Sequence, residues 1–346
     1  MNMDNKNNGN GIIYVACPGY FKTGGTELCH QLVYKLIQHG VKAIITYINC
    51  VNGEYVNPAF EKYVTEYTTI DKIVDENNNI IVIPETETDI IDRFNNIKVY
   101  LWWMSVDNFY NGRKLKLQVE ERGVIKAVIL DIRSRLIKKY RRKKGKSIKR
   151  LKGVEMHLAQ SEYAYHFLKD NKIPTEKIKI LSDYINTEYF LMKNENTTVS
   201  KENIIVYNPK KGKRYTRMIM KKGTDMTFIP IINMNNEEVI MQMMKAKIYI
   251  DFGPHPGKDR MPREAALLNC CIVTGRRGAA AYKDVDIPEK YKFSDKKKNI
   301  SSITECLRHL LSDYNTAIND YSKYRNKILA EEKLFEKQAL EIFGNK

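Results

Sequence analysis

Several signatures that would place the chain in a common functional class are missing from its sequence. The six cysteines form no CxxC pair and no Cys/His cluster with zinc spacing, so we expect free thiols in a reducing compartment. The first residues, MNMDNKNNGNG, lack the apolar core of a secretory signal. Apolar runs such as 127–130 and 270–273 are too short to span a bilayer. We therefore expect a cytoplasmic protein without a membrane span.

Motifs of nucleotide and nucleic-acid binding are also missing. The Gly-rich turn 17–27, CPGYFKTGGTE, contains no GKS or GKT and no GxGxxG, so it is neither a P-loop nor a dinucleotide fingerprint. No RNP signature and no zinc finger occurs. No DxD stands at the end of an expected strand, so we expect no metal and no cofactor.

Charge is distributed unevenly along the chain. The 346 residues include 58 Lys or Arg and 41 Asp or Glu, which gives a net charge of +17. Residues 133–152 hold twelve Lys or Arg and no acid, and residues 210–222 hold seven more and no acid. The remainder is close to neutral, so the excess indicates anion binding at two particular places.

Short apolar runs alternate with amphipathic stretches, a pattern typical of parallel sheets that helices cover on both faces. We expect strands at 11–17, 41–48, 79–83, 97–102, 155–159, 177–181, 203–207, 227–231, 248–252 and 271–274. We expect helices at 27–39, 214–221, 237–247 and 262–269, and a helical region from about 301 to 343. The polar stretch 186–203 separates two Rossmann-like domains.

Two loops that follow expected strands carry residues suited to a phosphorylated ligand. Gly24 and Gly25 let backbone N–H groups approach a ligand, and Thr26 is expected to be the N-cap of the next helix. Lys210 and Lys211 precede a helix, where two cations suit a diphosphate. The alternatives are a plain tight turn for the first loop and a solvated basic helix end for the second.

A third loop, 251–264, is the densest in functional groups. Six of its ionisable side chains fall within ten positions: His255, Lys258, Asp259, Arg260, Arg263 and Glu264. Pro262 is expected at the first helical position, which places Glu264 in the first turn. There Glu264 either accepts hydrogen bonds from paired sugar hydroxyls or complements the helix dipole.

The stretch 248–275, IYIDFGPHPGKDRMPREAALLNCCIVTG, resembles the donor-site segment of GT-B glycosyltransferases. In that family a strand and a Glu-Gly-Phe-Gly loop lead into a helix opened by Pro and Glu. Residues 24–26 resemble the glycine loop of the family's N-terminal domain, and residues 181–190 look like the segment that ends it. The first Glu of the family's pair is missing, because Pro256 stands eight residues before Glu264.

This resemblance implies an α/β GT-B fold in which two Rossmann-like domains face a cleft. The implied domains are an acceptor domain at 1–185, a donor domain at 186–325, and a return helix at 326–346 that packs on the N-terminal domain. The implied activity is metal-independent hexosyl transfer from a nucleotide sugar. The acceptor is expected to be a saccharide or a lipid-linked molecule of cell-surface polysaccharide or glycolipid synthesis.

The resemblance also implies roles for particular residues. Glu264 matches the Glu that contacts the nucleotide ribose, and Lys210 or Lys211 replaces the pair of cations on the diphosphate. The expected donor-binding residues are Gly24, Gly25, Thr26, Lys210, Lys211, Gly257 and Glu264. The candidate catalytic residues within the third loop are His255, Lys258 and Arg260.

An inverting reaction needs a general base, and Asp107, after the strand 97–102, is our first candidate. The alternative interpretation of Asp107 is a surface turn residue. The neighbouring Trp102 and Trp103 either stack on a sugar or pack in the core. His157 falls within an expected strand and is interpreted as a core histidine.

The basic segment 133–152 interleaves cations with apolar residues, which favours peripheral binding to the anionic inner face of a membrane. Its alternative is a solvated loop. Two other interpretations of the whole chain stay open: a glycosyltransferase-like partner without activity, and a nucleic-acid-binding protein that uses this segment. The main interpretation expects no nucleic-acid partner.

Overall fold

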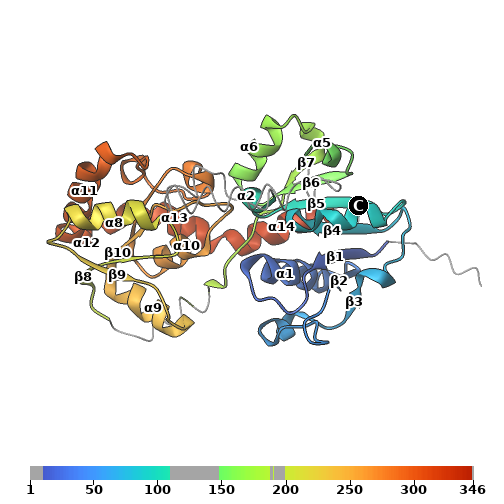
Figure 1. The fold of residues 1–346 in the computed structure, drawn as a ribbon. Helices are drawn as coiled ribbons and strands as arrows, with labels where there is room; N and C mark the ends of the chain where they lie inside the picture. Colours follow the sequence, from blue (N-terminus) through green and yellow to red (C-terminus); the bar gives the residue numbers. More distant parts are fainter. Residues whose placement is uncertain (1–10, 110–147, 188–189, 191–198, 345–346) are drawn as a thin grey trace, which may run out of the picture.

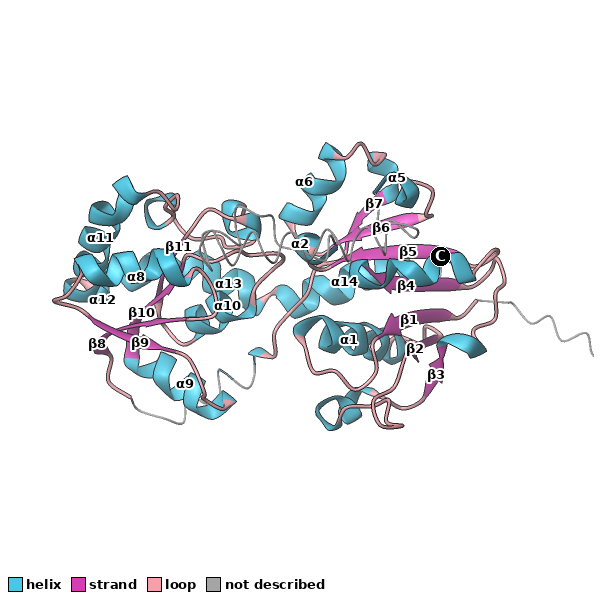
Figure 2. Ribbon diagram, viewed as in Figure 1, coloured by secondary structure: helices cyan, strands magenta, loops and turns pink. Residues whose placement is uncertain are grey.

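The computed structural model describes residues 11–109, 148–187, 190 and 199–344. Residues 133–147 of the basic segment therefore lie outside the described residues. The described part consists of two α/β units joined by a long C-terminal helix (Figure 1). Figure 2 shows the strands of each unit flanked by helices. No helix in the described ranges is both long enough and apolar enough to cross a membrane.

The N-terminal domain is built on a seven-stranded parallel sheet, because its strands are nearly continuous apolar runs that are buried on both faces. In spatial order the strands are β3 (Tyr67–Thr69), β2 (Ala43–Tyr47), β1 (Ile13–Cys17), β4 (Ile80–Pro84), β5 (Lys98–Trp103), β6 (Met156–Ala159) and β7 (Ile178–Ile180). Its α-helices are α1 (Gly24–Gln38), α2 (Val106–Phe109), α5 (Ile148–Leu151) and α6 (Glu162–Asp170). The three-residue β3 is the one strand of this sheet that was not expected from the sequence.

The C-terminal domain has a four-stranded parallel sheet in the order β11 (Cys271–Thr274), β10 (Ala246–Asp251), β8 (Glu202–Tyr207) and β9 (Thr227–Pro230). Its helices are α8 (Lys213–Lys222), α9 (Asn236–Lys245), α10 (Arg260–Leu267), α11 (Ile300–Ser312), α12 (Tyr314–Ala317) and α13 (Ser322–Leu329). One hydrophobic cluster fills this domain, whereas two clusters cover the opposite faces of the N-terminal sheet.

The last helix, α14 (Glu331–Phe343), returns to the N-terminal domain and packs beside α1 (Figure 1). Phe335 stacks on Trp102, with ring centroids 6.4 Å apart, and Phe343 lies against Tyr100. The apolar face of α14 thus completes the core over one face of the sheet. This arrangement confirms the expected fold class, with two Rossmann-like domains and a C-terminal helix that crosses back.

Candidate active site

The start of α1 places Gly24 against the other domain, whereas Gly25 lies near Met104 of its own domain. The helix begins at Gly24, and a Cβ atom there would lie 3.7 Å from Cδ of Arg260. The sequence predicted Thr26 as the N-cap, but the N-cap is Thr23, because Thr23 has the extended backbone that a cap requires. Thr26 occupies the third helical position, where its Oγ1 accepts a hydrogen bond from the Thr23 N–H at 2.9 Å in a capping box.

The β10–α10 loop (residues 252–259) leads into α10, which begins at Arg260 with Asp259 as its N-cap. Pro262 is therefore the third helical residue and not the first. It is tolerated there because the amides of the first turn have no partner within the helix. Glu264 consequently lies beyond the first turn, which argues against the interpretation that its carboxylate serves the helix dipole.

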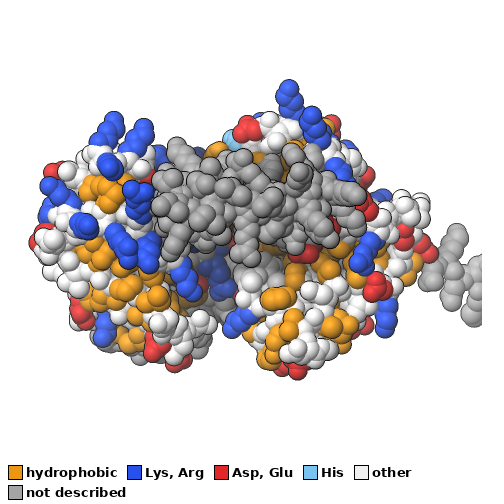
Figure 3. All heavy atoms as spheres, in the orientation of Figure 1, with side chains coloured by type: hydrophobic (Ala, Val, Ile, Leu, Met, Phe, Trp, Pro, Cys, Tyr) orange, Lys and Arg blue, Asp and Glu red, His pale blue; other side chains and the backbone are white. Residues whose placement is uncertain are grey.

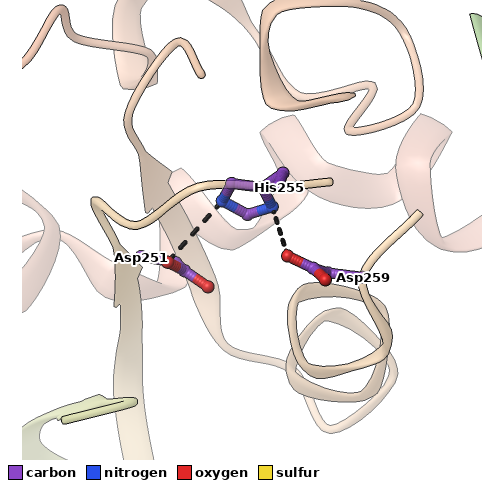
Figure 4. A group of neighbouring side chains, drawn as sticks. All are labelled: Asp251, His255 and Asp259. Carbon is purple, nitrogen blue, oxygen red and sulfur yellow. Dashed lines mark ion pairs between the residues drawn. The ribbon is translucent and has the colours of Figure 1, made fainter. Parts of the chain in front are cut away.

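His255 lies between two carboxylates from the two ends of this loop (Figure 4). Its Nδ1 is 2.8 Å from Oδ2 of Asp259, and its Nε2 is 3.6 Å from Oδ1 of Asp251. Lys211 Nζ reaches the same Asp259 oxygen at 2.5 Å. Burial disfavours charge on the imidazole, but the attraction of Asp251 and Asp259 outweighs it and raises the pKa of His255.

The carboxylate of Asp259 is correspondingly stabilised as an anion. Burial alone would raise its pKa, but His255 and Lys211 lower the pKa to about 2. The ligand atoms of Asp251, His255 and Asp259 lie within 4.8 Å of one another, which is close enough to consider a metal ion. However, the two ring nitrogens face different carboxylates, and a lysine already neutralises Asp259. This geometry suits an imidazolium ion better than a metal ligand.

Lys258 and Arg263 form a buried network with acids from outside the domain. Arg263 donates to both oxygens of Asp183 at 3.0 and 2.6 Å and to Glu331 at 2.7 Å. Lys258 Nζ lies 3.2 Å from Asp183 and 2.8 Å from Glu331. The side chain of Lys258, a candidate catalytic residue, is only 6% exposed, so it serves this network. Burial opposes charge on Asp183, but Arg263 and Lys258 lower its pKa.

Arg260 joins the two domains at the glycine turn. Its guanidinium pairs with Glu27 of α1 and lies 3.3 Å from Oε1 of Glu264, one helical turn along α10. Its side chain is 40% exposed, in contrast to the buried Lys258 and Arg263. Burial raises the pKa of Glu264, and Arg260 opposes that shift. Of Lys258, Arg260 and Arg263, Arg260 is thus the accessible cation.

Gly257 has a packing role at the boundary between the domains. A Cβ atom there would lie 2.0 Å from the carbonyl oxygen of Met104. On either side, Pro256 O accepts a hydrogen bond from Val106 N–H at 2.9 Å, and Lys258 N–H donates to Gln160 at 3.2 Å. The β10–α10 loop can therefore touch the ends of β5 and β6 only because residue 257 has no side chain.

The two lysines at the start of α8 differ in their surroundings. Lys210 is exposed, whereas Lys211 is half-buried against the β10–α10 loop through its ion pair with Asp259. Gly212 follows them, with φ of +54°. This position requires glycine, because a Cβ atom would lie 2.7 Å from the backbone of Phe252. Lys211 therefore belongs to the loop cluster, and Lys210 belongs to the surface.

Asp107 lies in the four-residue helix α2 after β5 and is half-buried. It accepts a hydrogen bond from the hydroxyl of Tyr163 at 3.0 Å.

Trp102 and Trp103 are fully buried, so they pack in the core and do not stack on a ligand. The indole N–H of Trp102 donates to Leu181 O, and that of Trp103 donates to Nδ1 of His157. His157 is buried as well, and burial lowers its pKa to about 4.

Sequence reasoning missed Asp183 and Glu331 as partners of the loop cations. Asp183 lies within 181–190, a segment that had been singled out, but its pairing with Arg263 spans 80 residues. Glu27 was missed as a partner of Arg260 for the same reason. The structure does bring Gly24 of the first loop together with Arg260 and Glu264 of the third loop, which the sequence placed in two separate motifs.

No family model matches the sequence. No curated protein matches it either. The structure is similar to several solved glycosyltransferase structures at low sequence identity. Anabaena Alr3699/HepE in complex with UDP-glucose gives a TM-score of 0.58 at 10% identity, covering 95% of this chain and 98% of that chain. The chain has the GT-B fold.

Two further structures agree along nearly the whole chain. Sucrose-phosphate synthase from Thermosynechococcus elongatus gives a TM-score of 0.57 at 11% identity, covering 96% of this chain and 97% of that chain. WaaG, a glycosyltransferase involved in lipopolysaccharide biosynthesis, gives 0.53 at 12% identity and covers 96% of this chain and 100% of that chain. The likeness thus extends over both domains of the GT-B fold.

Proposed function

We propose that the chain is a glycosyltransferase that moves a sugar from a nucleotide-sugar donor to a saccharide or lipid-linked acceptor of cell-surface polysaccharide or glycolipid synthesis. The observation that carries the proposal is the placement of Arg260 and Glu264 after β10, opposite the start of α1 in the other domain. Support comes from HepE, whose structures hold UDP-glucose or UDP, and from WaaG, which is involved in lipopolysaccharide biosynthesis.

In the proposed complex, Glu264 accepts hydrogen bonds from the ribose hydroxyls of the donor. The diphosphate lies at the N-terminus of α1, where the first amides have no partner within the helix and the helix dipole favours an anion. Arg260 exchanges its pairing with Glu27 for the phosphate. Lys211 supports this side of the site through Asp259, since the two already form an ion pair.

In the transfer step, the bond between the anomeric carbon and the diphosphate oxygen breaks, and the bond to the acceptor oxygen forms. Arg260 and the start of α1 stabilise the negative charge that the diphosphate gains. If the reaction inverts the anomeric centre, Asp107 takes the proton of the acceptor hydroxyl. His255 has no exposed surface, so we assign it to positioning the loop between Asp251 and Asp259.

We further propose that transfer needs no metal ion and no cofactor, because protein cations serve the leaving group. The proposed location is the cytoplasm, with peripheral contact to the inner face of a membrane through residues 133–152. These proposals rest on the resemblance and the charge pattern. Measuring sugar transfer in the presence of EDTA tests the proposal that no metal ion is needed.

Calorimetric titration of the chain with a panel of nucleotide sugars tests the proposed donor binding. One or more of them should bind, and Glu264→Ala should weaken the binding about tenfold or more, since a hydrogen bond to a charged group contributes about 1.5–3 kcal/mol. Glu305→Ala, which removes an exposed carboxylate on α11 of the same domain, is the matched control and should bind like the wild type. A chain that binds no nucleotide sugar contradicts the proposal.

The absence of the family's first Glu favours one alternative, a glycosyltransferase-like partner that binds a donor without transferring sugar. Pro256 takes that position, and its carbonyl is occupied by Val106. Donor hydrolysis, measured as release of nucleoside diphosphate, separates the two functions. Donor binding without any release, even with a range of acceptors, favours the inactive partner.

A further inference from the structure

The C-terminal domain carries a basic face that the proposed donor site does not use. All its members are exposed: Lys210, Lys213, Arg214, Arg217, Lys221, Lys222, Lys296, Lys297 and Lys298. Figure 3 shows Lys and Arg side chains gathered on this side of the domain, over the position of α8 in Figure 1. Of the seven cations in 210–222, only Lys211 pairs with the β10–α10 loop.

The basic face is one surface because the structure joins its two parts. The hydroxyl of Tyr215 on α8 donates a hydrogen bond to the carbonyl of Lys296 at 2.8 Å, which fixes the turn 296–298 beside the helix. The opposite side of α8 is buried through Tyr215, Thr216 and Ile219. The helix is therefore anchored by its apolar side and presents its cations outward.

The charges of the basic face are not neutralised within the described part of the chain, where none of its nine cations forms an ion pair. The nearby acids are used by other residues, since Asp225 pairs with Arg308 and Asp295 pairs with Arg277. Uncompensated like charges repel one another, so an external polyanion that covers them stabilises this surface.

The side chains of the basic face indicate which kind of polyanion it binds. Seven of the nine cations are lysines, which contact phosphates as hydrated point charges and impose no fixed geometry. The large hydrophobic side chains that are most exposed in the described residues lie elsewhere, so the face offers neither an aromatic platform for bases nor the apolar centre of a protein interface. A planar array of phosphates fits these properties.

We propose that the basic face docks the C-terminal domain onto a bilayer rich in anionic phospholipid. Clusters of Lys and Arg on a surface helix attract anionic headgroups, and each cation adds to the binding free energy. Gly212 packs against Phe252, so α8 begins beside the β10–α10 loop and the docked surface borders the candidate active site. The proposal does not depend on glycosyl transfer and is separate from binding through residues 133–152.

Co-sedimentation of the full chain with vesicles tests the docking. The probe vesicles contain equal parts of phosphatidylcholine and phosphatidylglycerol, and pure phosphatidylcholine is the comparison. The test variant carries four changes on the basic face: Lys213→Gln, Arg217→Gln, Lys221→Gln and Lys297→Gln. Its partitioning onto anionic vesicles should fall about tenfold or more, with unchanged thermal unfolding.

A matched control separates a local surface from net charge. The control variant removes four exposed lysines elsewhere: Lys72→Gln, Lys172→Gln, Lys179→Gln and Lys245→Gln. It should keep most of the vesicle binding. Equal losses in the two variants, or full binding by the test variant, overturn the proposal. Tighter binding of the wild type to duplex DNA than to anionic vesicles, lost in the test variant, also overturns it in favour of nucleic acid.

Discussion

Arg263 donates hydrogen bonds from both of its terminal nitrogens to the two carboxylate oxygens of Asp183, in the other domain. The arginine side chain is 1% exposed, and a second acid, Glu331 at the start of α14, shares its charge. A buried ion pair of this kind tolerates the removal of neither partner, because the remaining charge has no water to stabilise it.

Replacing Arg263 by Met should therefore destabilise the protein strongly. The expected loss in the free energy of unfolding is about 3–5 kcal/mol, the usual result of leaving a buried charge without its partner. Urea denaturation followed by circular dichroism measures it. The control is Arg308→Met, because Arg308 pairs with Asp225 at an exposed site and its removal should leave stability nearly unchanged. Similar losses for both variants would contradict the inferred role.

The pH dependence of stability should report the charge on His255. Its folded pKa is raised, because Asp251 and Asp259 outweigh the effect of burial. The stabilisation is therefore fully present below the unfolded pKa of about 6.5 and is lost as the pH rises through the folded value. Chemical denaturation across this range should show a decline in the wild type that is weaker in His255→Asn.

His309→Asn, which removes an exposed histidine on α11, is the control and should keep the wild-type slope. A direct NMR titration of the His255 imidazole measures its pKa in the folded wild type without a variant. An imidazole that loses its proton below pH 6.5 would refute the charged state.

Arg260→Gln should weaken the binding of the nucleotide sugar about tenfold, because the diphosphate loses a charged hydrogen-bond donor. Calorimetry with the donor that the wild type binds measures the change. Arg276→Gln is the matched control for Arg260→Gln, since the Arg276 side chain is also 40% exposed and also pairs with a glutamate. Wild-type donor affinity in Arg260→Gln would remove Arg260 from the site.

Gly257→Ala should disturb the contact between the domains. The added Cβ atom meets the backbone of Met104, which cannot move aside as a side chain can, so we expect a loss of about 1–3 kcal/mol in the free energy of unfolding. Gly153→Ala is the control, because nothing lies within 4 Å of the added atom. Equal stability of the two variants would show that the loop adapts.

Sugar transfer should continue in the presence of EDTA. Protein cations take the place of a metal in the proposed site, and His255 faces Asp251 and Asp259 through different nitrogens. The measurement is the transfer rate before and after chelation. Activity that EDTA abolishes and a divalent ion restores would refute metal independence. It would indicate Asp251, His255 and Asp259 as candidate metal ligands.

The sequence predicted the fold well because the strands are continuous apolar runs between polar turns. The prediction of β10 and the loop after it succeeded for that reason, with boundaries within two residues of those expected. The helix starts two residues earlier than predicted, since Pro262 fits the third helical position as well as the first. The network around Arg263 was not predictable. Its partners Asp183 and Glu331 lie 80 and 68 residues away, and no local pattern indicates which acid meets which base.

The roles of individual loop cations also needed the structure. Lys258, Arg260 and Arg263 stand in one short stretch and look alike in the sequence, yet two are buried in a network and one is accessible. Burial separates a structural cation from one that can meet a ligand, and burial depends on the packing of both domains.

The chain passes between the domains twice, leaving the first after Asp183 and returning to it at Glu331. Both passages are held by the same guanidinium, so the two covalent connections are fastened at almost one point. We expect relative movement of the domains to be a rotation about an axis close to Arg263. Residues beside that axis, including the β10–α10 loop, travel least, whereas the far edges of the two sheets travel most.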